Sequence, residues 1–123
     1  MCSLCADALE SQEHLFFECV VSRKYLKILS SKLRIDIPWL QTWNWWHNSR
    51  FQNLFVKKLI GACLIAVFYT VWRSRNLCLF EQVLISPDAV MKKTCVDVQT
   101  RCRAVVSSPV VLKYEDWLLR LCS

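Results

Sequence analysis

The sequence predicts a mainly α-helical protein, in which a small N-terminal motif of cysteines and histidine precedes a bundle-like domain of three to four helices. Three observations lead to this fold class. The 123 residues include one glycine, too few for the many tight turns of a sheet protein. Apolar residues recur at helical spacing over long stretches. Finally, three cysteines and a histidine lie close together at the start of the chain.

The N-terminal motif has the pattern C-x2-C-x8-H-x4-C and is formed by Cys2, Cys5, His14 and Cys19. Structural zinc sites are usually closed by four thiolate or imidazole ligands in a tetrahedron. Three thiolates and one imidazole leave no position for a catalytic water, so the motif predicts a structural Zn²⁺ site and not a hydrolytic one. The alternative is that these residues are ordinary buried thiols.

The spacing of the last two ligands constrains the backbone between them. His14 and Cys19 are five residues apart, which on a regular α-helix separates their side chains by about 140°. We therefore expect the segment between them to be distorted, or to begin its helix near the histidine.

A first helix is predicted to begin at Ser11, with Glu13 in its first turn, and to run to about Leu33. Its apolar positions recur at helical spacing, at Phe17, Val21, Tyr25, Ile28 and Leu29. Its other face carries a basic stripe next to the metal motif, formed by Arg23, Lys24, Lys27, Lys32 and Arg34. A solvated helix face is the common role of such a stripe. The alternative is a surface that contacts the phosphates of RNA or DNA.

A tryptophan-rich segment follows the helix break at Pro38. It contains Trp39, Trp43, Trp45 and Trp46. Large aromatic rings dominate cores and interfaces, so we favour packing between helices or against another polypeptide. A stacking platform for unpaired bases is the alternative.

The strongest predicted helix runs from Phe51 to about Phe80 and is apolar almost all round. Its uncharged stretch, residues 59–72, is shorter than the roughly 20 residues that span a bilayer, so a core helix is favoured over a membrane segment. Near its end, Arg73 and Arg75 are candidates for phosphate contact. Cations also interact favourably with a helix C-terminus, which is the alternative role for both.

Two further helices complete the prediction. Residues 86–88, Ser-Pro-Asp, combine an N-cap, a first-turn proline and a carboxylate near the positive helix end. A helix is therefore expected from Pro87 to about Val106, ended by residues 107–109. A short final helix is expected over residues 114–122, with Trp117, Leu118 and Leu121 on one side.

The net charge and the cysteines limit the partners and the compartment that we expect for the protein. A net charge of +6 with a pI near 9.0 permits nucleic-acid binding without requiring it. No secretory signal precedes Cys2, so we expect an intracellular protein, nuclear or cytoplasmic and not secreted, with reduced cysteines. The five cysteines outside the motif are expected to be core residues or incidental thiols: Cys63, Cys78, Cys95, Cys102 and Cys122.

The residues around the ligands resemble a known family. Residues 2–5 read CSLC and residues 10–19 read ESQEHLFFEC, which resembles the zinc-binding region downstream of the polymerase in plant LINE-type (non-LTR) reverse transcriptases. Residues 65–76, IAVFYTVWRSRN, and the following Phe80 resemble the apolar helix that trails this zinc motif in the same family.

The resemblance implies a reverse transcriptase zinc-binding-like domain over residues 1–85, truncated at its N-terminus, and a C-terminal helical extension over residues 86–123. Family members carry residues before the first cysteine, including a Trp-rich segment, whereas Met1 directly precedes Cys2 here. The resemblance therefore implies a C-terminal fragment of a retrotransposon-derived protein.

Catalytic residues of the parent enzymes are missing from the sequence. Reverse transcription requires aspartates that hold two metal ions, and the polymerases of this family carry two adjacent aspartates. This chain has no Asp-Asp pair, ribonuclease-H-like carboxylate set, phosphate-binding glycine loop or nucleophile triad. We therefore expect no enzymatic activity.

Two functions remain as hypotheses. The first is a non-catalytic zinc-binding module derived from a retrotransposon reverse transcriptase, with binding of RNA or DNA inherited or vestigial. Its phosphate contacts would come from Arg23, Lys24, Lys27, Arg34, Arg73 and Arg75. The alternative is a protein-interaction module, or a decayed remnant with no selected activity. Its apolar helix and tryptophans would meet the parent polymerase polypeptide or another protein, and a membrane partner is not expected.

Overall fold

The computed structural model describes residues 2, 4–5, 9–12, 14–51, 53–81 and 86–122, and of residues 17, 80, 81 and 122 it describes the backbone alone. These ranges contain six α-helices, two short π-helical segments and no strand. In chain order they are η1 (His14–Glu18), α1 (Val20–Leu33), α2 (Thr42–Asn48), α3 (Leu54–Asn76), η2 (Leu77–Glu81), α4 (Pro87–Val105), α5 (Ser108–Lys113) and α6 (Glu115–Cys122). The mainly α-helical class, with a cysteine and histidine cluster at its N-terminal end, is confirmed.

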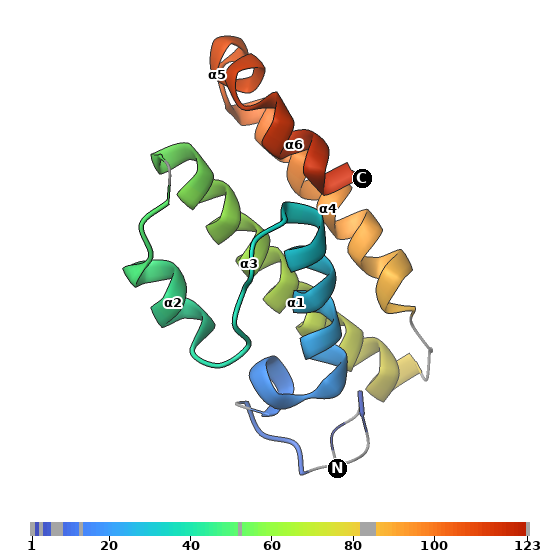
Figure 1. Cartoon of the computed structure of the whole chain (residues 1–123). Helices are drawn as coiled ribbons and strands as arrows, with labels where there is room; N and C mark the ends of the chain where they lie inside the picture. Colours follow the sequence, from blue (N-terminus) through green and yellow to red (C-terminus); the bar gives the residue numbers. More distant parts are fainter. Residues whose placement is uncertain are drawn as a thin grey trace.

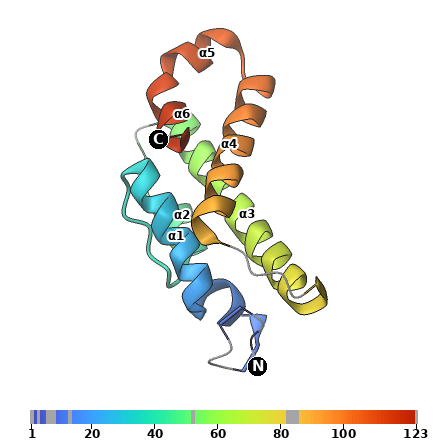
Figure 2. The same ribbon diagram turned by 90° about the vertical axis from the view of Figure 1, so that its right-hand side faces the viewer.

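The longest helix, α3, runs through the bundle (Figure 1). Both α1 and α4 pack against α3 and against each other, and α6 folds back along α4 to contact α1. The N-terminal segment lies at one end of the bundle and α5 at the opposite end, as both views show (Figures 1 and 2). The metal motif therefore sits beside the start of α1 and the end of α3.

The core consists of apolar side chains from α1, α3, α4 and α6. Its largest fully buried members include Tyr25, Leu29, Leu33, Ile60, Leu64, Met91, Leu118 and Leu121. Each aliphatic side chain of this size contributes about 1.5–3 kcal/mol when it is fully buried. The hydroxyl of Tyr25 has a partner inside this core, because it lies 3.0 Å from the Oγ atom of Ser74. Cys63 and Cys95 are also buried, which confirms the expectation of core thiols at these two positions.

The boundaries of α3 follow from its first residues. The helix begins at Leu54, three residues later than Phe51, because the side chain of Asn53 caps it. The Oδ1 atom of Asn53 accepts a hydrogen bond of 2.9 Å from the backbone N–H of Val56, which satisfies one of the free donors of the first turn. After Asn76 the chain continues as the π-helical segment η2. The helical stretch thus ends near the predicted Phe80.

The C-terminal region holds one helix that the sequence did not indicate. As expected, α4 begins at Pro87, and it ends within one residue of Val106. Residues 107–109 do more than end it, because Ser107 is an extended N-cap and Pro109 lies in the first turn of α5. The expected final helix is α6, which buries Leu118 and Leu121.

The tryptophan-rich segment packs against α3. The indole Nε1–H of Trp46 donates to the carbonyl oxygen of Lys57 at 2.9 Å, and the Trp46 ring lies over Gly61. Trp45 meets Phe51 edge to face at 5.7 Å between ring centroids. Both rings are half-buried against the core, so the favoured packing role is confirmed for Trp45 and Trp46.

Within the described residues, one helical stretch, Leu54–Leu79, is long and apolar enough to cross a membrane, with a mean hydropathy of 1.9. Half of its apolar window is buried inside the protein. Length and composition alone do not separate a core helix from a membrane span, and packing by α1 and α4 is the role that the fold displays for α3.

We predict that Gly61→Ala destabilises the protein through its contact with Trp46. An added Cβ atom would lie 2.8 Å from Cζ2 of Trp46, a ring already held by its bond to Lys57. Displacing the ring should outweigh the roughly 1 kcal/mol that alanine gains over glycine in a helix. Urea unfolding should show a net loss of about 1 kcal/mol.

The matched control is the same substitution in a Trp46→Ala background. There the obstructing ring is absent, so Gly61→Ala should raise the free energy of unfolding. An increase in stability in both backgrounds would contradict the packing of Trp46 on Gly61.

Candidate metal centre

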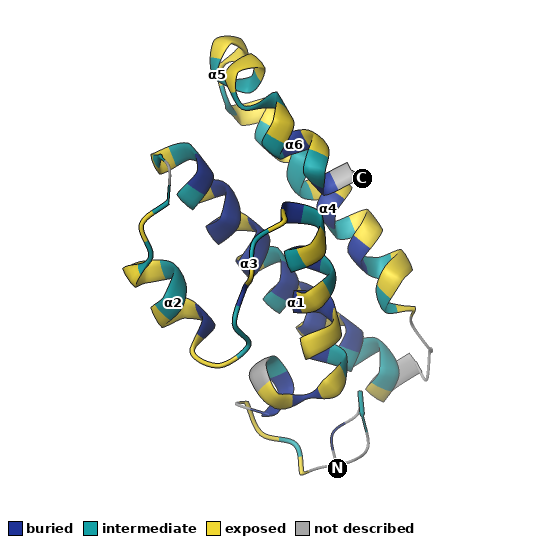
Figure 3. Cartoon of the chain, in the orientation of Figure 1, coloured by how far each residue is buried: buried dark blue, intermediate teal, exposed yellow. Residues whose placement is uncertain are grey.

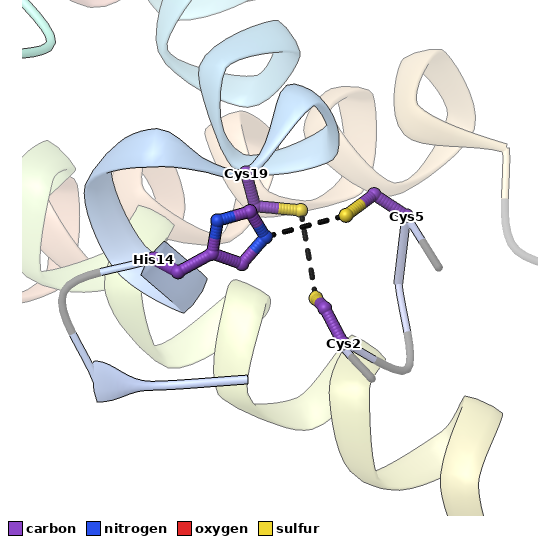
Figure 4. A group of neighbouring side chains, drawn as sticks. All are labelled: Cys2, Cys5, His14 and Cys19. Atoms are coloured by element: carbon purple, nitrogen blue, oxygen red, sulfur yellow. Dashed lines mark hydrogen bonds between the residues drawn. The ribbon is translucent and has the colours of Figure 1, made fainter. Parts of the chain in front are cut away.

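The structure brings together all four predicted ligands, Cys2, Cys5, His14 and Cys19. Their ligand atoms lie within 4.8 Å of one another, and Figure 4 shows the four side chains pointing toward a common centre. The Sγ atoms of Cys2 and Cys19 are 3.8 Å apart, and Sγ of Cys5 lies 3.3 Å from Nε2 of His14. A tetrahedral ion with Zn-like bond lengths needs about 3.8 Å between sulfurs and about 3.6 Å between sulfur and nitrogen. The cluster therefore has the dimensions of a four-coordinate metal site.

The ligands differ in their burial. Cys2 and Cys19 are 1% and 0% exposed and His14 is 9% exposed, whereas Cys5 is half-buried on the outer side. Burial raises the pKa of the Cys19 thiol to about 12, although the backbone N–H groups of Val21 and Ser22 act in the opposite direction. A cation at the centre reverses this balance, because a coordinating thiol loses its proton. Binding of a metal at this site would therefore be coupled to proton release.

A π-helical turn solves the problem of the five-residue spacing. Ser11 starts the turn, since its Oγ atom accepts from the N–H of His14 at 3.0 Å and its carbonyl from the N–H of Leu15 at 2.9 Å. Glu13, expected beside it, lies outside the described residues. The carbonyl of His14 then accepts from the N–H of Cys19 at 2.6 Å, five residues on. This π-helical turn is wider than an α-helical one and brings Cys19 back to the side on which His14 lies. The expected distortion between the two ligands is therefore confirmed.

Cys19 itself interrupts the helix that was predicted to run from Ser11 to Leu33. Its backbone is extended, with φ −61° and ψ 134°, and it forms the N-cap of α1. Its carbonyl accepts from the N–H of Arg23 at 3.0 Å, the first bond of α1. The Sγ atom thus lies at the positive end of α1, which favours a thiolate. The single predicted helix is therefore two helical segments that meet at a ligand.

An ion pair ties the ligand loop to the last turn of α3. Arg75 donates from Nε to Oε1 of Glu10 at 2.7 Å and from a terminal nitrogen to Oε2 at 3.3 Å. The bonds from Arg75 hold the pKa of the Glu10 carboxyl below its usual value. Because the pKa is lower in the folded state, this clamp stabilises the fold above the ordinary carboxyl pKa and is lost as the pH falls through the lowered value.

The clamp engages Arg75, one of the residues predicted to contact phosphates. Both donor groups of Arg75 that face Glu10 are hydrogen-bonded to its carboxylate. The contact with the ligand loop therefore accounts for the orientation of the Arg75 side chain. Arg73 is exposed and remains accessible to solvent. Sequence reasoning missed Glu10, which lies 65 residues from its partner and has no local pattern that signals the pair.

The other predicted nucleic-acid residues lie on α1 and at its end. Arg23, Lys24, Lys27 and Arg34 are all exposed, and exposed positions alternate with buried ones along the helix (Figure 3). Arg34 is the C-cap, in the left-handed conformation with φ 58°, and its N–H donates to the carbonyl of Ser30. The guanidinium of Arg23 lies 4.4 Å from the ring centroid of Trp39. Four members of the basic stripe are thus exposed, whereas Lys32 is half-buried, and the stripe runs from one turn after Cys19 to the opposite end of α1.

Comparison with protein-family models, curated proteins and solved structures finds no match for this chain. The family resemblance therefore rests on the motifs of the sequence.

We predict that Arg75→Gln weakens metal binding by loosening the ligand loop. Cobalt(II) is a suitable probe, because thiolate coordination gives it strong absorption. Its affinity should fall by about two- to fivefold, the effect of a solvent-accessible ion pair.

The matched control is Arg103→Gln, which removes the same charge from a similar bidentate pair. Arg103 donates to both carboxylate oxygens of Glu115, at 2.7 and 3.0 Å, where α4 faces the start of α6. Cobalt affinity should be unchanged in this variant. Equal losses in the two variants, or no loss in Arg75→Gln, would show that the clamp does not support the site.

Proposed function

We propose that this chain is a structural zinc-binding module. The observation that carries the proposal is the convergence of three thiols and one imidazole, whose ligand atoms all lie within 4.8 Å of one another. This ligand set suits zinc, which has no redox chemistry and accepts sulfur and nitrogen donors without a preference for another geometry. Three thiolate ligands also require reduced cysteines, so we place the protein in a reducing compartment, the nucleus or cytoplasm.

We propose further that the module is non-catalytic. A zinc ion held by Cys2, Cys5, His14 and Cys19 has a complete shell and no open position for water or substrate. The chemistry that remains is structural, because the ion crosslinks the N-terminal segment to the start of α1.

A common origin with non-LTR reverse transcriptases is supported by contacts between the two resembling segments. Glu10 of the first segment pairs with Arg75 of the second. Phe16 also packs edge to face on Phe68, with 5.9 Å between ring centroids. Residues that define the two motifs thus touch each other, as expected if they were selected as one unit.

The proposed activity of the module is contact with the phosphate backbone of RNA or DNA. Arg23, Lys24 and Lys27 of α1 are exposed and begin one turn after the ligand Cys19, so metal binding would fix the end of the helix that presents them. Positive side chains on a rigid element supply most of the non-specific affinity for nucleic acids. Lys24 and Lys27 are the principal candidates, since no ion pair or aromatic contact engages them in the described structure.

A second candidate function, protein interaction, is favoured by one exposed face of α3. Ile65, Tyr69 and Trp72 recur at helical spacing and are 61%, 64% and 47% exposed. A partner helix or the parent polymerase polypeptide would cover them. The assay below separates the two candidates, because an interaction module has no need for affinity to a polyanion.

We predict that the zinc-loaded protein binds a short single-stranded oligonucleotide at low salt. Affinity should fall linearly on a log–log plot against salt concentration. In the double variant Lys24→Gln/Lys27→Gln, the slope should decrease by about 1.4, because two phosphate contacts to a single strand are lost. Fluorescence anisotropy over a salt series measures both quantities.

The control is Lys92→Gln/Lys93→Gln, which removes the same two charges from exposed positions of α4. Its salt slope should match that of the unmodified protein. No binding at low salt, or an equal change in both variants, would contradict a specific role for α1.

A further inference from the structure

A groove lies between α1 and the segment that leads to α2. It has a volume of about 420 Å³, within the range of small-ligand sites. The buried side chains of Leu26 and Ile37 contribute to its lining. The polar and aromatic lining residues include Arg23, Lys24, Lys27, Asp36 and Trp39.

The wall of this groove is fixed in place by hydrogen bonds. The Oγ atom of Ser30 on α1 accepts from the N–H of Ile37 at 3.2 Å. The hydroxyl of Thr42, fully buried, donates to the carbonyls of Pro38 and Trp39 at 2.9 and 3.2 Å. Residues 37–39 are thus held to α1 on one side and to α2 on the other. The backbone that carries the Trp39 side chain is therefore held in place.

Arg23 extends this surface with a second flat group. Its guanidinium carbon lies over the Trp39 ring, 4.4 Å from the centroid, in a cation–π contact. Arg23 is exposed, so its guanidinium is accessible to a further flat group. Proteins that bind unpaired bases use both kinds of plane, aromatic rings and arginine guanidiniums, as stacking partners.

We propose that this groove binds one unpaired nucleotide of a single-stranded nucleic acid. The base stacks on the layer formed by Arg23 and Trp39, and Lys24 and Lys27 contact the flanking phosphates. This inference deepens the proposed function, on which it rests, by naming single strands as the preferred ligand. Charge complementarity supports this occupant, because three cationic side chains line the groove against one carboxylate, Asp36.

The same arrangement disfavours duplexes. In a paired helix the base faces are covered by their neighbours, and only edges and phosphates are accessible. The stacking layer would then contribute nothing, and only the lysines would bind. Asp36, placed in the lining, repels phosphate but can accept a hydrogen bond from an amino group of a base.

The decisive variant is Arg23→Lys, which keeps the positive charge and removes the planar group. The probes are a labelled single strand, the same strand with every base removed, and a duplex of the same sequence. The zinc-loaded protein should bind the intact strand about fivefold or more tightly than the abasic one, the lower range for stacking of one base. Arg23→Lys should abolish most of this preference and leave the salt slope unchanged.

The control variant is Arg101→Lys, the same substitution at an exposed position of α4 outside the predicted phosphate contacts. It should retain the full preference for intact strands. Parallel titrations with RNA and DNA of one sequence show which backbone the groove prefers, and a base preference with either one supports the site.

Two outcomes overturn the inference, and they differ in what they say about the proposed function. Equal affinity for intact, abasic and duplex probes, unchanged in Arg23→Lys, would eliminate the stacking groove and leave phosphate binding by α1 in place. No binding to any probe at low salt would eliminate both.

Discussion

Two buried sulfur atoms, from Cys2 and Cys19, lie 3.8 Å apart at the end of the bundle, with the sulfur of Cys5 and the Nε2 atom of His14 completing the cluster. Apart from the ligands, Leu15 is the one large aliphatic side chain buried among the described residues before α1, and Phe16 and the Glu10–Arg75 ion pair add partly exposed contacts. So small an apolar contact cannot offset the entropy of ordering a loop. An ion held by the four ligands would supply further free energy to this end, as in other small metal-dependent folds.

The metal end is connected to the helices through specific polar contacts. Glu10 and Arg75 join the ligand loop to the last turn of α3, and Tyr25 and Ser74 join α1 to the same turn. The end of α3 thus receives contacts from both sides of the metal motif. Ordering of the ligand loop should therefore also stabilise α1 and α3, the two helices that carry the proposed binding surfaces.

Residue spacing predicted the structure correctly where the structure depends on residues that are close together in the sequence. The ligand set follows from four residue types at short separations, and the five-residue interval from His14 to Cys19 could not fit a regular helix. Periodicity placed α3, because apolar residues recur along it over many turns, and the Ser-Pro-Asp start signal of residues 86–88 placed α4. The exact device between the ligands, a π-helical turn followed by an extended cap, was not predictable, since a helix restart would satisfy the same spacing.

Features that depend on contacts between residues far apart along the chain could not be predicted from the sequence. No residue near Arg75 indicates that its partner is a carboxylate 65 residues away. The local sequence indicated only a cation at a helix end. Likewise, the contact of Arg23 with Trp39 depends on the placement of residues 37–39, which hydrogen bonds to Ser30 and Thr42 hold in position. The start of α3 was missed for a smaller reason, because the side chain of Asn53 competes with apolar periodicity and caps the helix later.

The most direct test of this account is zinc content together with the coordination shell of the ion. We expect about one zinc per chain in protein purified without chelator, and X-ray absorption should show three sulfur neighbours near 2.3 Å and one nitrogen near 2.0 Å. A Cys19→Ser variant should lose the ion, whereas Cys102→Ser, at a half-buried thiol outside the cluster, should retain it. A folded protein that binds no zinc, or one with an oxygen-rich shell, would contradict the metal centre on which the proposed function rests.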